Sequence, residues 1–247
     1  MSDFDFAVME KNMISVNILT ARINREYIEE NFDILLGELY PQRKETVLGF
    51  NNKNASYTSL VAGHVLMEAY KKVYGVSGRD IVIEKGEYGK PYIVGCEKFK
   101  FNISHSGDYV VIAYTMDEGV SSLGIDVERV RSKDSDMMVA HRFFTKDEID
   151  YISDGLECSD EDVRFYKIWT MKEAYIKMTG KGLSTRLDSF SVYPDELMIS
   201  GVSSDDMYNE AEQYNNFKIN IKIMDGYIIT VCADSVGEIR FLYDKYA

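Results

Sequence analysis

Residues 122–128 of the chain read Ser-Leu-Gly-Ile-Asp-Val-Glu, which places two carboxylates two positions apart. Side chains alternate between the faces of a β-strand, so Asp126 and Glu128 share one face while Leu123, Ile125 and Val127 share the other. Two carboxylates held this close repel each other unless a cation lies between them, and their oxygens suit Mg2+. An exposed strand face that happens to be acidic has the same pattern, so this segment alone leaves both interpretations open.

A second group of reactive side chains lies in residues 169–177, which read Trp-x-x-Lys-Glu-Ala-x-x-Lys. Trp169, Glu173 and Lys177 recur every four residues, which predicts one stripe along a helix. With the two strand carboxylates, this stripe supplies three acidic groups and a cation for phosphoryl-type chemistry. A solvated Glu–Lys pair beside a core tryptophan would have the same spacing, and this alternative also stays open.

The third candidate is the end of a predicted strand, where residues 101–108 read Phe-Asn-Ile-Ser-His-Ser-Gly-Asp. Ser104 and His105 could bind phosphate oxygens there. Neighbours on a strand point to opposite faces and no Gly-x-Ser-x-Gly elbow is present, which disfavours a serine hydrolase. His64 and His141 lie in apolar surroundings, and we predict that both are packing residues.

The elements that must position these groups occur twice in the chain. The pattern Glu-Ala-Tyr-x-Lys-x-x-Gly occupies residues 68–75 and again 173–180, and Phe-Lys-x-Asn-Ile followed by a β-rich run begins at residues 99 and 217. Each unit is predicted to contain a long helix, a strand and a hairpin. The predicted helices span 58–74 and 161–179, and the hairpins span 99–115 and 217–233. Coincidence among common helix and hairpin residues is the alternative explanation.

The connection between the two units also carries local signals. Residues 134–152 are predicted to be helical with a break near Phe144. After the break, Thr145 and Glu148 form a capping box for the next helix. Gly75 is predicted to end the first long helix. The boundary between the units is predicted near residues 117–119.

Composition narrows the class of protein. The 247 residues carry a net charge of -13, with 28% charged and 45% hydrophobic residues, so the chain is predicted to be globular and not a nucleic-acid binder. The three cysteines are far apart and have no zinc-site or disulfide spacing, which favours a reducing cytoplasm. We find no export signal and no membrane-spanning run, so we expect neither export nor membrane insertion.

Taken together, the motifs resemble those of the 4'-phosphopantetheinyl transferases of the long, surfactin-synthetase-activating type. The shared motifs, in order, are Gly-Lys-Pro at 89–91, the run at 101–106, Gly-Ile-Asp-Val-Glu at 124–128, Phe-Phe at 143–144 before Glu148, and the helix residues 169–177 followed by Gly-Lys-Gly-Leu-Ser at 180–184. The resemblance implies an α+β fold of two pseudo-symmetric halves, here 1–118 and 119–247. Each half would have a long helix on a mostly antiparallel sheet, with the active site at their interface and the protein acting as a monomer.

The resemblance also implies an activity. Coenzyme A would bind between the halves with Mg2+ on its pyrophosphate, a serine of an apo carrier protein or domain would attack the β-phosphorus, and adenosine 3',5'-bisphosphate would leave. Asp126, Glu128 and Glu173 match the metal ligands, and Glu173 is also placed to activate the serine. The residues that match the family's catalytic residues are Glu173, Asp126 and Lys177. Among the matches to coenzyme A contacts, Lys177 would bind the pyrophosphate, and Ser104 and His105 would bind phosphates. Lys90 would lie beside the adenine, Arg43 on the 3'-phosphate, and Ser59 at the start of a helix near it.

Two positions depart from the family pattern at the 3'-phosphate. Thr46 and Thr58 stand where basic residues are usual, and Lys44 or Lys53 could substitute for them. Carrier domains are usually acidic, so an enzyme with a net charge of -13 needs a local docking patch. The candidates for this patch are Arg129, Arg131, Lys133, Phe143 and Phe144.

Two other functions are compatible with the same residues. A metal-dependent phosphatase or nuclease could use the three carboxylates, although the acidic balance and the Ser104-His105 pair disfavour it. A non-catalytic coenzyme A-binding relative is the other alternative, and the presence of all three carboxylates disfavours it. The sequence does not identify the carrier, which could belong to peptide synthesis, polyketide synthesis or fatty acid synthesis, nor the tolerance for acyl-coenzyme A.

Overall fold

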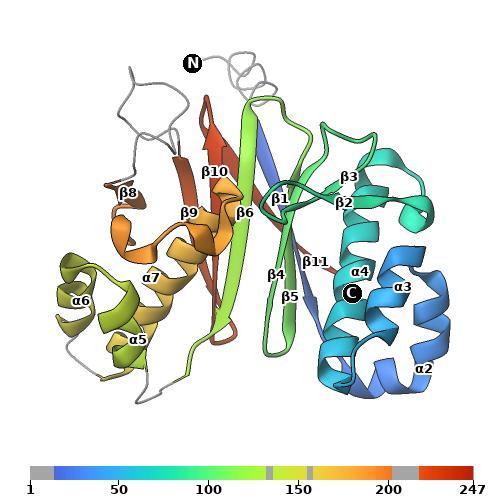
Figure 1. Ribbon diagram of the computed structural model, residues 1–247, viewed down its shortest axis with the longest axis horizontal. Helices are drawn as coiled ribbons and strands as arrows, with labels where there is room; N and C mark the ends of the chain where they lie inside the picture. Colours follow the sequence, from blue (N-terminus) through green and yellow to red (C-terminus); the bar gives the residue numbers. More distant parts are fainter. Residues whose placement is uncertain (1–13, 132–135, 155–157, 202–216, 247) are drawn as a thin grey trace, which may run out of the picture.

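The two halves pack sheet against sheet, with helices on both outer faces (Figure 1). The computed structural model describes residues 14–131, 136–154, 158–201 and 217–246. Within them one sheet has the strand order β11-β1-β5-β4 and the other has the order β6-β10-β9. The predicted α+β class with two halves is therefore confirmed.

The two halves repeat one order of elements: a strand, shorter helices, a long helix, a short two-stranded ribbon and a hairpin. The first half consists of β1 (Ile14–Arg22), α2 (Arg25–Glu38), α3 (Pro41–Leu48), α4 (Lys53–Tyr74), β2 (Ile83–Lys85), β3 (Pro91–Ile93), β4 (Lys100–Ser106) and β5 (Tyr109–Thr115). The second consists of β6 (Val120–Arg129), α5 (Asp136–Phe143), α6 (Lys146–Ser153), α7 (Cys158–Thr179), β7 (Ser191–Tyr193), β8 (Met198–Ser200), β9 (Phe217–Met224) and β10 (Tyr227–Ser235). The last strand, β11 (Ile239–Tyr246), follows them.

Local signals explain where the helices begin and end. The Asn52 side chain accepts a hydrogen bond from the Ala55 amide and so caps α4, which begins before the predicted residue 58. Gly75 ends α4 in the left-handed conformation, as predicted. Thr145 and Glu148 form the predicted capping box at the start of α6.

Strand pairing confirms both predicted hairpins. β4 pairs antiparallel with β5, and β9 pairs antiparallel with β10. The final strand behaves differently, because β11 pairs in parallel with β1 from Ile14–Ile239 to Ala21–Tyr246. The end of the chain thus completes the sheet of the first half. The division at 118 and 119 stays a prediction.

Three hydrophobic clusters hold these layers together. One lies between α4 and its sheet and includes Leu66, and one lies between α7 and its sheet and includes Ile168. The third lies between the two sheets and contains Leu123, Ile125 and Val127 of β6. The predicted alternation along β6 is therefore confirmed, because its apolar side chains point to the other sheet.

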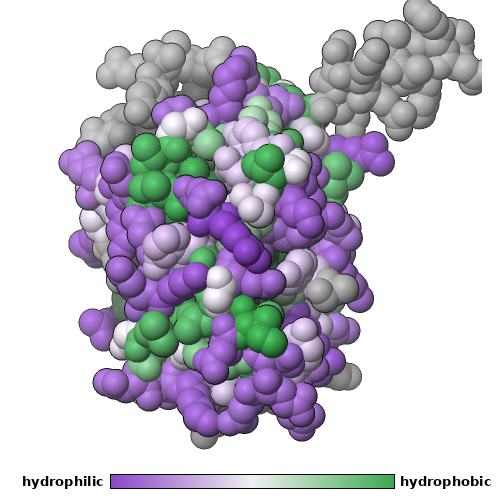
Figure 2. Space-filling model, turned by 90° about the vertical axis from the view of Figure 1, so that its right-hand side faces the viewer, coloured by the Kyte–Doolittle hydropathy of each residue, from purple (hydrophilic) through white to green (hydrophobic). Residues whose placement is uncertain are grey.

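The face that carries α2, α3 and α4 is mainly hydrophilic with separate hydrophobic patches (Figure 2). This distribution is typical of helices that turn their apolar sides toward a sheet. No helix in the described ranges is both long enough and apolar enough to cross a membrane.

Candidate active site

The two carboxylates of β6 point toward α7. Gly124 marks this face, because a Cβ atom added there would lie 2.1 Å from the Ala174 carbonyl oxygen and 2.4 Å from the Met178 nitrogen. Strand and helix backbones therefore touch at Gly124. Asp126 and Glu128 lie on this same face and come close to the helix.

The helical stripe predicted from spacing meets these carboxylates in one cavity. Its volume is about 270 Å³, and its walls come from both halves. The lining residues are Ile103, Ser104 and His105 of β4, Asp126 and Glu128 of β6, and Trp169, Glu173 and Lys177 of α7. Every residue singled out in the three motifs for its chemistry therefore reaches the same space.

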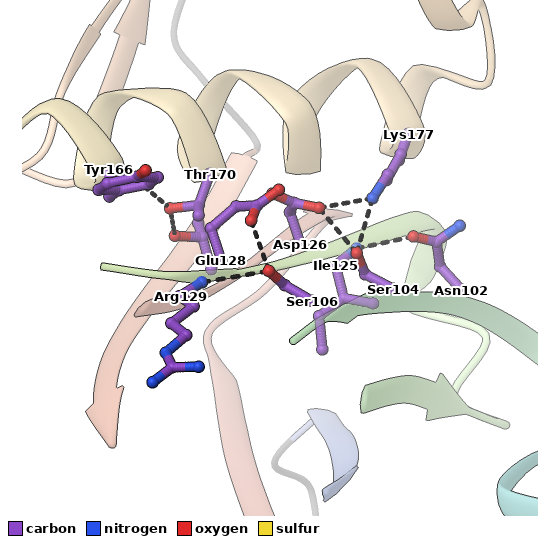
Figure 3. A network of polar contacts seen from close by, with 11 residues as sticks. Asn102, Ser104, Ser106, Ile125, Asp126, Glu128, Arg129, Tyr166, Thr170 and Lys177 are labelled. Carbon is purple, nitrogen blue, oxygen red and sulfur yellow. Dashed lines mark hydrogen bonds and ion pairs between the residues drawn. The ribbon is translucent and has the colours of Figure 1, made fainter. Parts of the chain in front are cut away.

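Hydrogen bonds connect the halves across this cavity (Figure 3). The Lys177 ammonium lies 2.6 Å from Asp126 Oδ1 and 3.0 Å from Ser104 Oγ. Ser104 in turn donates to the same Asp126 oxygen at 2.8 Å. The Lys177 ammonium is thus held against Asp126 and not against the glutamate four residues before it.

Two further residues of β4, for which the sequence motifs predicted no individual role, hold β6 in place. The Asn102 side-chain oxygen accepts a hydrogen bond from the Ile125 amide at 2.9 Å. The Ser106 hydroxyl donates to Glu128 at 2.6 Å (Figure 3). The sequence held one sign of the role of Asn102, because it is a polar side chain inside an apolar strand. Buried polar side chains almost always have a hydrogen-bond partner.

Among the described residues that line the cavity, three carboxylates face one lysine ammonium. Burial, followed by the negative charge of Asp126, raises the pKa of Glu173. His105 keeps contact with solvent, yet desolvation and then the Lys177 ammonium lower its pKa. Asp126 Oδ2 is buried and has no hydrogen-bond partner among the residues that the structure describes. A cation would relieve both the crowding of negative charge and the unpaired oxygen.

These residues fit Mg2+ in chemistry and location. Three carboxylates supply hard oxygen donors at one cavity wall, as magnesium requires. Within the described ranges, however, no three His, Cys, Asp or Glu side chains already converge as a formed metal site would. The Lys177 ammonium occupies Oδ1 of Asp126, which leaves Oδ2 for the ion, and the three carboxylates must come closer together to bind it.

A larger cavity of about 540 Å³ opens beside the first one and shares Ile103 and His105 with it. Arg43 and Ser59 line it, as do both threonines at the departing positions, Thr46 and Thr58. The Arg43 guanidinium is fixed by Tyr40 Oη at 3.0 Å and by Ser59 Oγ at 3.3 Å. Arg43 and Ser59 therefore form one polar wall.

The cation that accompanies Arg43 in this cavity is Arg25, which was not predicted from any sequence motif. Its guanidinium is oriented by Asn54 Oδ1 at 3.1 Å and by Asp108. Lys44 and Lys53, which were suggested as replacements for the missing basic residues, have other partners. Lys44 donates to the Gly37 carbonyl, and Lys53 pairs with Glu29. No local pattern marked Arg25, since its role depends on helix α2 lying beside the β4–β5 turn.

Lys90 lines neither of these two cavities. Its ammonium donates to Ser122, Leu123 and Met178 of the other half, whereas the adjacent Pro91 does line the larger cavity. That Lys90 lies beside a bound adenine stays a prediction.

Only some of the residues predicted to form a docking patch for the carrier are accessible at the surface. Phe144 is 5% exposed and belongs to the core under α7, so its assignment to a docking surface is wrong. Phe143 is half-buried and packs edge-on against Trp169. Arg129 and Arg131 are exposed, and Lys133 lies outside the described residues.

Comparison with known proteins decides the family. The model of the "4'-phosphopantetheinyl transferase superfamily" matches residues 122–232, and that of "4'-phosphopantetheinyl transferase, N-terminal" matches residues 26–117. The chain is 35% identical over 173 residues to 4'-phosphopantetheinyl transferase Sfp of Bacillus subtilis (strain 168), covering 69% of this chain and 73% of that protein. The chain belongs to the 4'-phosphopantetheinyl transferase superfamily.

Two further relatives agree with this assignment. The transferase is 34% identical over 170 residues to 4'-phosphopantetheinyl transferase ffp of Bacillus subtilis, with 69% of this chain and 73% of that protein covered. It is 30% identical over 176 residues to 4'-phosphopantetheinyl transferase gsp of Aneurinibacillus migulanus, with 71% and 70% covered. The resemblance stated from the motifs is confirmed, and the transferase is an enzyme of this class.

Proposed function

We propose that the transferase moves 4'-phosphopantetheine from coenzyme A to a serine of an apo carrier protein at the interface of its halves, using Mg2+ held by Asp126, Glu128 and Glu173. The observation that carries this proposal is the 270 Å³ cavity. It brings the three carboxylates and Lys177 of one half against Ser104 and His105 of the other.

The chemistry assigns each group a task. When bound, Mg2+ would neutralise charge on the pyrophosphate oxygens. Lys177 would donate to a pyrophosphate oxygen, and Ser104 and His105 would orient the phosphates. The Glu173 carboxylate would take the proton of the carrier serine, directly or through water. The serine oxygen bonds to the β-phosphorus, the bond from that phosphorus to its bridging oxygen breaks, and adenosine 3',5'-bisphosphate leaves.

The larger cavity is proposed to hold the nucleotide end of coenzyme A. Arg43 is the proposed contact for the 3'-phosphate, with Ser59 fixing its guanidinium. Arg25 would supply the second positive charge in place of the basic residues absent at Thr46 and Thr58.

We further propose that one chain is sufficient and acts as a monomer in the cytoplasm. Its two halves, 1–118 and 119–247, together supply every proposed ligand and catalytic group. Cys96 and Cys232 are free thiols, which suits a reducing compartment.

Mass spectrometry of the carrier tests the proposed function. Purified transferase is incubated with an apo carrier, coenzyme A and Mg2+, and the carrier is weighed. The expected gain is one phosphopantetheinyl group, which is lost with a chelator and restored by added Mg2+. A panel of peptidyl and acyl carriers left unmodified would refute the proposal, and transfer that is insensitive to the chelator would refute the metal assignment.

A further inference from the structure

Lys90 reaches from one half of the molecule into the other. It lies at the end of the turn between β2 and β3, where the Gly86 amide bonds to the Lys90 carbonyl. Its ammonium has three acceptors: Ser122 Oγ at 2.9 Å, the Leu123 carbonyl at 2.9 Å and the Met178 carbonyl at 3.0 Å. An ammonium has three hydrogens, so its donors are all used within the protein.

The three acceptors belong to the two elements that carry the proposed catalytic groups. Ser122 and Leu123 precede Asp126 on β6, and Met178 directly follows Lys177 on α7. The Met178 carbonyl is one of the last four of α7, which have no partner inside the helix. A positive charge at this helix end is favourable, and the Lys90 ammonium therefore acts as a cap. The Ser122 hydroxyl also donates to the Met178 carbonyl.

The geometry of the cavity depends on how β6 and α7 lie against each other. Their backbones touch at Gly124, and two residues further along β6 the Asp126 carboxylate meets Lys177 at 2.6 Å. A shift of α7 by about 1 Å would change every distance between the carboxylates of the two elements. Close packing at Gly124 prevents approach but not separation or sliding, so a further restraint is needed at this end of the helix.

We propose that Lys90 is a positioning residue, which fastens the end of α7 to β6 from the opposite half and so sets the distances between Asp126, Glu173 and Lys177. This inference rests on the proposed function. Burial lowers the pKa of Lys90 to about 8, and its hydrogen-bond acceptors are neutral oxygens. Placing an ammonium here is unfavourable by itself, which distinguishes Lys90 from exposed lysines such as Lys98 with its partner Glu118.

The test compares Lys90→Met with Lys98→Met, which removes an exposed lysine near the following strand. For each variant we would measure kcat, the KM and the dissociation constant for coenzyme A, and the thermal midpoint. Lys90→Met is expected to lower kcat by about tenfold to a hundredfold, because the reacting groups are misplaced. Its dissociation constant should stay within about twofold, and Lys98→Met should match the wild type. A crystal structure of Lys90→Met should show the end of α7 displaced from β6.

Two results would overturn the proposal. A raised dissociation constant with unchanged kcat would make Lys90 a ligand contact, and a lowered thermal midpoint with unchanged kcat would make it a purely structural residue. If Lys90→Met does not fold, Ser122→Ala replaces it, since it removes one acceptor and one bond to Met178. A folded Ser122→Ala with wild-type kcat would then reject the positioning role. Absence of transfer by the wild type would instead reject the proposed function.

Discussion

At the scale of single residues, the cavity depends on where each charge finds its partner. Lys177 pairs with Asp126, and the equivalent lysine of the first half, Lys72, pairs with Asp244. Neither ion pair joins the lysine to the glutamate one turn earlier on its own helix. The repeated Glu-x-x-x-Lys spacing therefore does not mark a helix-surface ion pair, and Glu173 keeps its carboxylate in the cavity.

The duplication provides a matched pair of variants at the glutamate. Glu173→Gln should lower kcat by roughly 10²- to 10⁴-fold at saturating Mg2+, because it removes a metal ligand or a base. Glu68→Gln, at the equivalent position of α4, should leave kcat unchanged. Both should keep a wild-type thermal midpoint to within a few degrees. Equal kcat values for the two variants would show that Glu173 carries no chemistry.

A second residue-scale prediction concerns Arg25. Arg25→Ala should weaken coenzyme A binding by about tenfold, since it removes one of two guanidinium groups from the larger cavity, which is proposed to hold the nucleotide end. The loss should be smaller for 3'-dephospho-coenzyme A if Arg25 contacts the 3'-phosphate. Lys53→Ala is the control, because Lys53 is exposed and pairs with Glu29. Calorimetric titration of both ligands would measure the effect, and an unchanged affinity for coenzyme A would remove Arg25 from the site.

At the scale of elements, α7 is held by contacts that the sequence motif does not describe. Lys172, from the same motif as Glu173, is fully buried and pairs with Glu148 at 2.8 Å. It also donates to the carbonyls of Leu187 and Phe190. Glu148 accepts from the Thr145 amide as part of its capping box. Lys172 therefore ties α7 to α6 and to the segment after α7.

Gly124 makes the packing of α7 on β6 testable. Gly124→Ala would bring a Cβ atom within 2.4 Å of two backbone atoms of α7, so the helix must move or the protein unfolds. The thermal midpoint should fall by several degrees or more, and a folded variant should lose most of its kcat. Gly37→Ala in α2 is the control, because its added Cβ would meet no atom within 4 Å beyond its chain neighbours and the nearby backbone of its own helix. It should be stabilised by about 0.5–1 kcal/mol, and similar midpoints for the two variants would contradict the close packing.

At the scale of the whole molecule, β6 and β11 each receive a hydrogen-bond acceptor from an asparagine of the hairpin that precedes them. Asn102 of β4 bonds to the backbone of β6, and the equivalent Asn220 of β9 accepts from the Tyr243 hydroxyl of β11 at 2.7 Å. Each repeat thus uses an asparagine in the first strand of its hairpin to hold the strand that follows. The pseudo-symmetry extends to the contacts between the sheets.

A substitution of Tyr243 tests how much the hydrogen bond between Asn220 and Tyr243 contributes to stability. Tyr243→Ala removes the bond to Asn220 and a ring that lies 4.0 Å from the Lys222 ammonium. The free energy of unfolding should fall by about 2 kcal/mol, measured by urea denaturation. Leu242→Ala is the control on the same strand, where the side chain is more exposed, and it should change stability by less than about 1 kcal/mol. The stabilising role of the Asn220–Tyr243 contact is refuted if Leu242→Ala lowers the free energy of unfolding more than Tyr243→Ala does.

Patterns close together in the chain predicted a large part of the structure. The alternation along residues 122–128 predicted which face carries Asp126 and Glu128, and the four-residue spacing on α7 predicted the stripe of Glu173 and Lys177. The capping box and the two hairpins were predicted from equally local signals. This is possible because the repeat of a strand or helix depends only on neighbouring backbone geometry.

The partners of these groups emerge only from the folded chain. The sequence motif matched Lys90 to a residue beside the adenine, yet its three acceptors in the structure lie in the other half. Arg25 of α2 lines the larger cavity, and β11, near the other end of the sequence, pairs with β1. A periodic pattern specifies the face on which a side chain lies, but not the element packed against that face. Contacts between distant segments are decided by how the layers fit together, which no short stretch of sequence records.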